Sequence, residues 1–117
     1  MNLAAEIRGV YEDCKLPGWD GYGSRAVTLE TMESALQFQE AVPVDVLKPA
    51  IVPEPDGRIG FEWHNTRGEW LIVSIGSDLG DIIYASCFSS TQVYSSEHEF
   101  PLLAILREHF AIPGGSC

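Results

Sequence analysis

The stretch "IGFEWHNTRGEWLIVSI", residues 59–75, decides the fold class. Its first half alternates apolar side chains, at Ile59, Phe61 and Trp63, with small or polar ones, which is the period of a strand with one buried face. The segment "HNTRGE" then predicts a hairpin loop with a glycine available for a positive φ. Residues 70–75 are apolar on both faces, as expected of a central strand. The stretch therefore predicts two antiparallel neighbours within a sheet.

Further strands are predicted on both sides of this hairpin. Residues 82–88, "IIYASCF", form a mostly apolar strand, and a weaker strand is expected around residues 92–95. Residues 43–57 contain four prolines, which exclude a central strand because proline donates no ladder amide. We expect an extended connector there, with "AIV" (50–52) as a short edge strand.

Helices are predicted before and after the strands. Residues 3–14 carry an apolar stripe at helical spacing. Thr28 is placed to cap a second helix, which continues through residue 42 and ends at Pro43. Pro101 suits the first turn of a last helix. The expected buried face of that helix consists of Leu102, Leu103, Leu106 and Phe110.

The order of these elements predicts an α+β fold. We expect an antiparallel meander sheet of three to five strands, with two N-terminal helices and one C-terminal helix packed on one face. The length of 117 residues suits a single domain spanning residues 1–117. No apolar run approaches the ~20 residues of a membrane span. The N-terminus lacks the features of a signal peptide, so a cytoplasmic protein is expected.

The charge of the chain is strongly negative and unevenly distributed. Acids exceed bases 17 to 7, a formal net charge of −10, which argues against direct binding of nucleic acid or anionic membranes. No Lys or Arg lies between Arg67 and Arg107. The acids of that tract are Glu69, Asp78, Asp81, Glu97 and Glu99. A charge of this size favours encounter with a basic partner.

The motif "WDGYG", residues 19–23, admits two interpretations. As a recognition loop, Trp19 and Tyr22 would anchor a partner beside the carboxylate of Asp20. As a structural loop, the glycines would adopt left-handed backbone angles, Asp20 would accept hydrogen bonds from nearby amides, and the rings would cover the end of the core. We favour the structural interpretation and keep the three side chains as candidate contacts.

Titratable side chains elsewhere do not form a recognisable catalytic or metal site. Glu62 and His64 share one face of a predicted strand and suit its solvent side, while His98 lies in an acidic loop and His109 on a helix surface. The three cysteines lack metal-ligand spacing, and a disulfide framework is not expected in a reducing compartment. Motifs for a nucleophilic serine, a zinc hydrolase or a phosphate loop are absent. We therefore expect a protein that is not an enzyme and that needs no cofactor or metal.

Two motifs resemble those of a known group. "WDGYG" (19–23) and "PEPDGRIGFEW" (53–63) are similar to motifs in a group of small bacterial proteins to which no function is assigned. The similarity covers roughly residues 16–75. The resemblance implies a fold of the kind derived above and supplies no catalytic residues.

These observations lead to a functional hypothesis. We expect a small acidic binding protein that inhibits or neutralises a basic, nucleic-acid-binding protein, as a toxin neutraliser or a phage-type (anti-CRISPR-like) inhibitor of a defence nuclease does. The alternatives are a small enzyme or ligand-binding module with an unrecognised pocket, and a homodimeric structural subunit that pairs through its sheet edge. The candidate partner-binding residues are Asp78, Asp81, Glu97, Glu99, Trp19, Asp20 and Tyr22.

Overall fold

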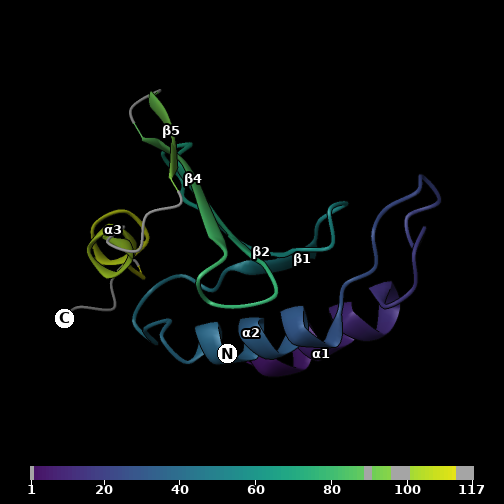
Figure 1. Cartoon of the computed structure of the whole chain (residues 1–117). Coiled ribbons are helices and arrows are strands. Elements are labelled where there is room, and N and C mark those ends of the chain that lie inside the picture. Colours follow the sequence, from purple (N-terminus) through teal and green to yellow (C-terminus); the bar gives the residue numbers. More distant parts are fainter. Residues whose placement is uncertain (1, 89–90, 96–100, 113–117) are drawn as a thin grey trace.

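The computed structural model describes residues 2–88, 91–95 and 101–112. Within these residues, α1 (Leu3–Cys14) and α2 (Leu29–Gln39) precede the strands and α3 (Leu102–His109) follows them. The strands are β1 (Ala50–Pro53), β2 (Ile59–His64), β3 (Trp70–Ile75), β4 (Ile82–Phe88) and β5 (Thr91–Ser95). They form one antiparallel sheet in the order β1-β2-β3-β4-β5 (Figure 1). The predicted meander and the short edge strand at "AIV" are confirmed.

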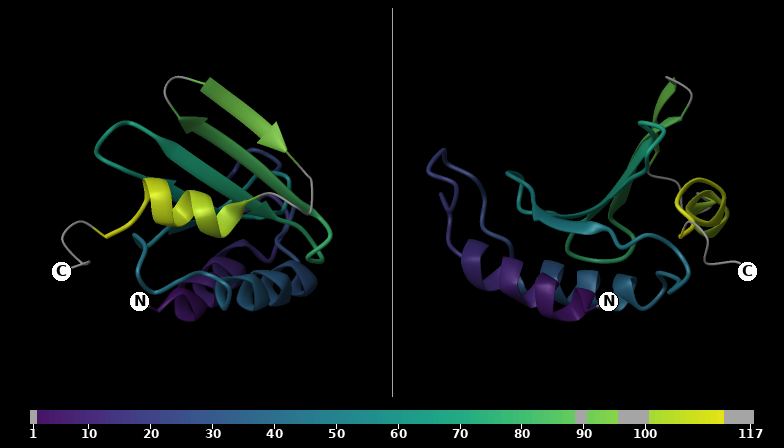
Figure 2. Two further views of the ribbon diagram at one scale, coloured as in Figure 1. Left: turned by 90° about the vertical axis from the view of Figure 1, so that its left-hand side faces the viewer. Right: turned by 180° about the vertical axis from the view of Figure 1, so that it is seen from behind.

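The helices cover one face of the strongly twisted sheet. Figure 1 and the two views of Figure 2 show α1 and α2 side by side under β1 and β2, with α3 against the same face at the other end of the sheet. Side chains alternate between the two faces along each strand, and the register places Phe61, Val73 and Tyr84 in one row across β2, β3 and β4. All three are buried on the side of the helices. The opposite face is not covered by any described element.

A single cluster of buried side chains joins the two layers. Phe61 and Trp63 are stacked with ring centroids 6.2 Å apart, and Phe38 of α2 packs edge-on against Phe61 at 4.9 Å. The indole Nε1 of Trp63 donates to the carbonyl of Leu47 at 2.9 Å, which satisfies the polar atom of a fully buried ring. The core thus fixes the position of the sheet relative to α2 and to the connector that precedes β1.

The second helix is shorter than its apolar pattern predicts. The hydroxyl of Thr28 caps α2 by accepting from the amide of Thr31 at 3.2 Å, as expected. At the other end, α2 stops at Gln39 instead of continuing through residue 42. The amides of residues 40–42 donate to carbonyls three residues earlier, so the chain tightens into turns while Val42 still reaches the core.

The last helix is rotated slightly from its expected orientation. Leu103 is 45% exposed, so its predicted burial is wrong. The buried stripe is centred on Leu102, Ile105 and Leu106, and this places Leu103 at its margin.

None of the described helices is long and apolar enough to cross a membrane.

Candidate functional site

The loop between α1 and α2 contains the "WDGYG" motif and is held closed by internal hydrogen bonds. Trp19 packs against the core, and its Nε1 donates to the carbonyl of Arg25 at 2.8 Å. Asp20 Oδ1 accepts from the amide of Tyr22 at 2.8 Å. The amide of Gly18 donates to the carbonyl of Ser24 at 2.7 Å. Trp19 and Asp20 therefore hold the loop in shape, as the structural interpretation predicts.

Tyr22 has a different environment in the same loop. Its side chain is 92% exposed, the highest exposure among the large hydrophobic residues of the described chain. It stands between Gly21 and Gly23, both at φ 80, so the chain turns sharply on each side of it. The loop thus displays one aromatic ring on a backbone fixed by its neighbours. Of the three candidate contacts in this loop, only Tyr22 is presented to solvent in this way.

The acids of the cation-free tract are not equivalent. Asp78 is exposed, and its Oδ1 accepts from the amide of Gly80 within the β3–β4 loop at 2.7 Å. Asp81 forms an ion pair with Arg58, with Nη2 to Oδ1 at 2.6 Å, and its carbonyl accepts from the amide of Gly76. Arg58 is distant in sequence but offsets the Asp81 charge, so Asp81 contributes mainly to the loop. Glu97 and Glu99 lie outside the described residues, as does His98.

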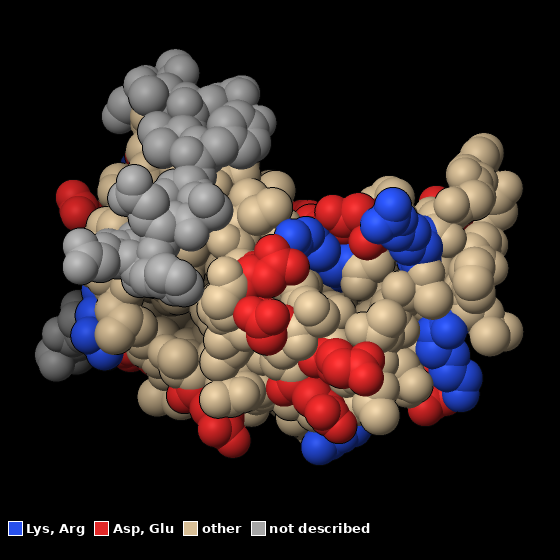
Figure 3. Space-filling model, viewed as in Figure 1, with Lys and Arg blue, Asp and Glu red and all other residues tan. Residues whose placement is uncertain are grey.

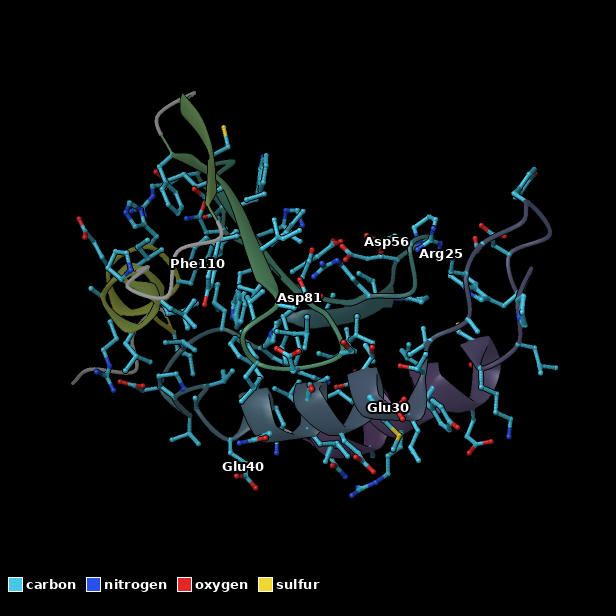
Figure 4. The ribbon with its side chains drawn as sticks, in the orientation of Figure 1. Arg25, Glu30, Glu40, Asp56, Asp81 and Phe110 are labelled. Atoms are coloured by element: carbon cyan, nitrogen blue, oxygen red, sulfur yellow. The ribbon has the colours of Figure 1, made fainter. Side chains whose placement is uncertain are left out.

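The fold brings a second set of acids next to Asp78. Residues 26–47 contain no Lys or Arg, and α2 lies in this tract. The hydroxyl of Ser34 on α2 donates to the carbonyl of Ser77 at 3.0 Å, which joins the helix to the β3–β4 loop. Figure 3 shows red patches running from this loop over α2, and Figure 4 labels Glu30, Glu40 and Asp81 on that side.

We call Glu30, Glu33, Glu40 and Asp78 the acidic band. All four side chains are exposed, and none has a cationic nitrogen within 4.0 Å among the described residues. The three glutamates are spaced three and seven residues apart, so they lie on one side of the helix. Of the band, only Asp78 is among the predicted contact residues. The three glutamates could have been predicted from the sequence, because no Lys or Arg occurs between Arg25 and Lys48.

A third cluster ties α3 to the β2–β3 hairpin. The carboxylate of Glu69 accepts from Asn65 Nδ2 at 2.9 Å, from His109 Nδ1 at 3.2 Å and from Arg67 Nη2 at 2.8 Å. The hydrogen bond from Asn65, followed by those from His109 and Arg67, lowers the pKa of Glu69 to about 2. The His109 ring also stacks on Phe88, with centroids 4.1 Å apart.

This cluster corrects the interpretation of His109 as a helix-surface residue. Its side chain is 20% exposed, and Asn65 Nδ2 also donates to its carbonyl at 2.8 Å. The cluster borders a cavity of about 560 Å³ between the hairpin and α3, where His64 and Thr66 also lie. No serine or cysteine is among the described residues lining it.

The remaining predictions on titratable groups concern Glu62 and His64. They lie on the face of β2 opposite the core, 3.7 Å apart between Oε1 and Nε2, with side chains 28% and 63% exposed. Among the described residues, no group of three or more His, Cys, Asp or Glu side chains is arranged to hold a metal ion. Comparison of the chain with protein-family models, curated proteins and solved structures finds no match.

Proposed function

We propose that this protein is a binding protein without catalytic activity, which occupies a basic surface on a nucleic-acid-binding protein and thereby inhibits or neutralises it. The acidic band is the observation that carries this proposal. It gathers carboxylates from two cation-free tracts on one side of the molecule. A band of one sign attracts a surface of the opposite sign and repels phosphate and anionic lipid.

The acidic band is not explained by the stability of α2. Glu30 near the helix N-terminus is favourable to the helix dipole, but Glu40 stands at the C-terminal end, where no basic residue offsets it. Glu30 and Glu33 are neighbours of like charge on the helix surface, which is also unfavourable. Since the position of Glu40 and the like-charge pair of Glu30 and Glu33 oppose helix stability, a role in recognition accounts for them better than a role in folding.

The test is the rate of association with a partner isolated on the immobilised protein and then purified. The triple variant Glu30→Gln, Glu33→Gln and Glu40→Gln is expected to associate about an order of magnitude more slowly at low ionic strength. The difference should shrink as salt is added, because the attraction is screened. Asp81→Asn is not part of this set, because that carboxylate pairs with Arg58.

A matched control separates the acidic band from net charge. The variant Glu12→Gln, Asp13→Asn and Glu108→Gln removes the same number of charges from exposed positions on α1 and α3, of which Glu12 pairs with the exposed Lys15 at 2.8 Å. It should associate at nearly the rate of the unmodified protein. Equal slowing by both triple variants would show that only the total charge matters, and association that is insensitive to salt would refute the proposal.

One observation favours a second candidate, a ligand-binding module. The cavity of about 560 Å³ borders His109, whose Nδ1 is held by Glu69, and this fixes the orientation of the ring. A small polar ligand in this cavity would contact both α3 and the β2–β3 hairpin. Screening of small polar compounds by amide chemical-shift changes tests the candidate, and shifts confined to residues 64–67 and 108–111 would support it.

A further inference from the structure

The face of the sheet opposite the helices carries an unusual set of side chains. The strand register aligns Glu62 with Ile72 and Ala85, and His64 with Trp70 and Cys87. These residues alternate with the core residues, so they face away from α1, α2 and α3. An antiparallel sheet that is open on one side normally exposes polar residues there. We call this surface the open face.

The open face is divided into two parallel stripes. On the β1–β2 side, Glu54, Glu62 and His64 form what we call the polar stripe, beside the smaller apolar side chains of Ala50 and Val52 on β1. The apolar stripe follows β3 and β4 and comprises Trp70, Ile72, Ile83, Ala85 and Cys87. Ile83 is 38% exposed, and the other members of the apolar stripe are half-buried. No described element packs over either stripe, and a contiguous uncovered apolar surface of this kind is typical of an interaction site.

The sequence of β3 is consistent with a covered open face. "WLIVSI" is apolar on both sides, which is the composition of a strand with two packed faces. Of the side chains of β3, those of Leu71, Val73 and Ile75 are buried on the side of the helices, while those of Trp70 and Ile72 face the other side. Figure 3 shows that the molecule is hollowed on its upper side, between the sheet and the loop that follows α1. Within residues 2–88, 91–95 and 101–112, the open face thus has no second layer, although its composition is that of a covered face.

The carboxylates of the polar stripe indicate that a partner covering this face would be positively charged there. Glu54 lies over Gly60, where a Cβ would meet its Oε2 at 3.0 Å, and accepts from the hydroxyl of Ser74 at 3.0 Å across β2. Burial raises the pKa of Glu54 and outweighs the hydrogen bond from Ser74 and the charge of Arg58, which lower it, while the nearby Asp56 and Glu62 raise it further. Neither Glu54 nor Glu62 has a Lys or Arg nitrogen within 4.0 Å among the described residues. A cation placed beside these carboxylates would compensate them.

A second copy of the chain does not fit this surface. Two open faces packed together would bring the carboxylates of one copy against those of the other, or against the apolar stripe of the other. Either arrangement buries unpaired charge, which is costly. A basic partner segment avoids both, because its cations meet the polar stripe while its apolar side chains meet the apolar stripe.

We infer that the open face docks an amphipathic segment of the basic partner, with Lys or Arg side chains over Glu54 and Glu62 and apolar side chains over Ile72 and Ile83. This inference rests on the proposed function, since it assigns a contact surface on the same partner. It places that contact away from the acidic band, on the opposite layer of the fold. Steering by the band and docking on the open face are therefore separable.

The three tryptophans provide built-in reporters for the test. Trp63 is in the core, Trp19 is in the closed loop, and Trp70 alone lies on the open face. The probe is a synthetic amphipathic helix of about 14 residues with adjacent leucine and lysine stripes. On titration into isotopically labelled protein at low salt, we expect the Trp70 indole signal and the amides of β2 to β4 to shift. The indole signals of Trp63 and Trp19 should stay in place.

Variants link these shifts to the two stripes. Ile72→Lys should weaken binding roughly tenfold, the loss expected when an aliphatic contact is replaced by a repelling charge. Glu62→Gln should weaken it by a smaller factor that disappears at high salt. Leu103→Lys makes the same change at a more exposed apolar side chain on α3 and should leave binding unchanged. A peptide with glutamates in place of lysines should not bind.

The outcomes distinguish this inference from the proposed function. Shifts confined to α2 and the β3–β4 loop would overturn docking on the open face but agree with a basic partner. Broadening of the Trp70 signal with protein concentration alone, together with a doubled mass, would show that a second copy covers the face. Absence of any shift, in the presence of salt-dependent partner binding, would also overturn the inference. Absence of both would refute the proposed function itself.

Discussion

Trp19 and Tyr22 lie three residues apart, yet their truncation should have very different effects on stability. Trp19 is half-buried against the core and donates a hydrogen bond to the carbonyl of Arg25. Truncation of a fully buried Trp or Phe costs ~3–5 kcal/mol, so a half-buried ring with one hydrogen bond should cost about 2–3 kcal/mol. Trp19→Phe keeps most of the packing and should lose about 1 kcal/mol, the value of the hydrogen bond. Tyr22→Ala should change the free energy of unfolding by less than about 0.5 kcal/mol.

Urea unfolding of the three variants, followed by far-UV circular dichroism, measures these differences. The free energy of unfolding should fall with urea concentration at an unchanged slope, because the surface exposed on unfolding is little changed. The reasoning would be refuted if Trp19→Ala unfolded at the same urea concentration as the unmodified protein. It would also fail if Tyr22→Ala were as destabilising as Trp19→Ala, since the exposed ring would then have an unseen structural role. In either case the loop would have to be reconsidered as a recognition site held by other contacts.

Other predictions follow from single features of the fold. The lowered pKa of Glu69 stabilises the folded state above pH 4.5, and this contribution is lost as the pH falls toward about 2. Thermal unfolding should therefore be less sensitive to pH in that window for Glu69→Gln than for the unmodified protein. Gly9→Ala should stabilise the protein by up to about 1 kcal/mol in urea unfolding, because a Cβ there meets nothing within 4 Å and α1 gains helix propensity. Gly57→Ala should destabilise it by more than about 1 kcal/mol, since φ is +90 and the Cβ would lie 2.8 Å from the Ala26 carbonyl.

The fold was largely predictable because its signals are local. The alternation in residues 59–64 and the uninterrupted apolar run in residues 70–75 determine which strands are half-buried and which are central. Prolines confine β1 to the sheet edge. The end of α2 was not predictable in the same way. Val42 keeps the helical spacing of a core residue, so the pattern cannot distinguish a continuing helix from turns that deliver the same side chain to the core.

The candidate sites depend on contacts between distant parts of the chain, which sequence patterns express weakly. Glu69 and His109 are separated by 40 residues, but Glu69 has the same strand parity as Leu71 and Val73, which indicates that it faces the helices. The pair of Arg58 and Asp81 follows from the meander, because the β1–β2 and β3–β4 turns lie at the same end of the sheet. Once the topology is known, both contacts can be inferred, but neither can be read from a single segment.

The acidic band and the open face should contribute to different stages of the same encounter. Exposed carboxylates act over a distance comparable to the Debye length, so the band should change the association rate and its salt dependence. The half-buried stripes of the open face act only on contact, so Ile72→Lys should mainly raise the dissociation rate. Combining the two sets of changes tests this division, since effects on separate steps should multiply. A combined variant whose loss of affinity is no larger than that of one set alone would instead place both features in a single contact.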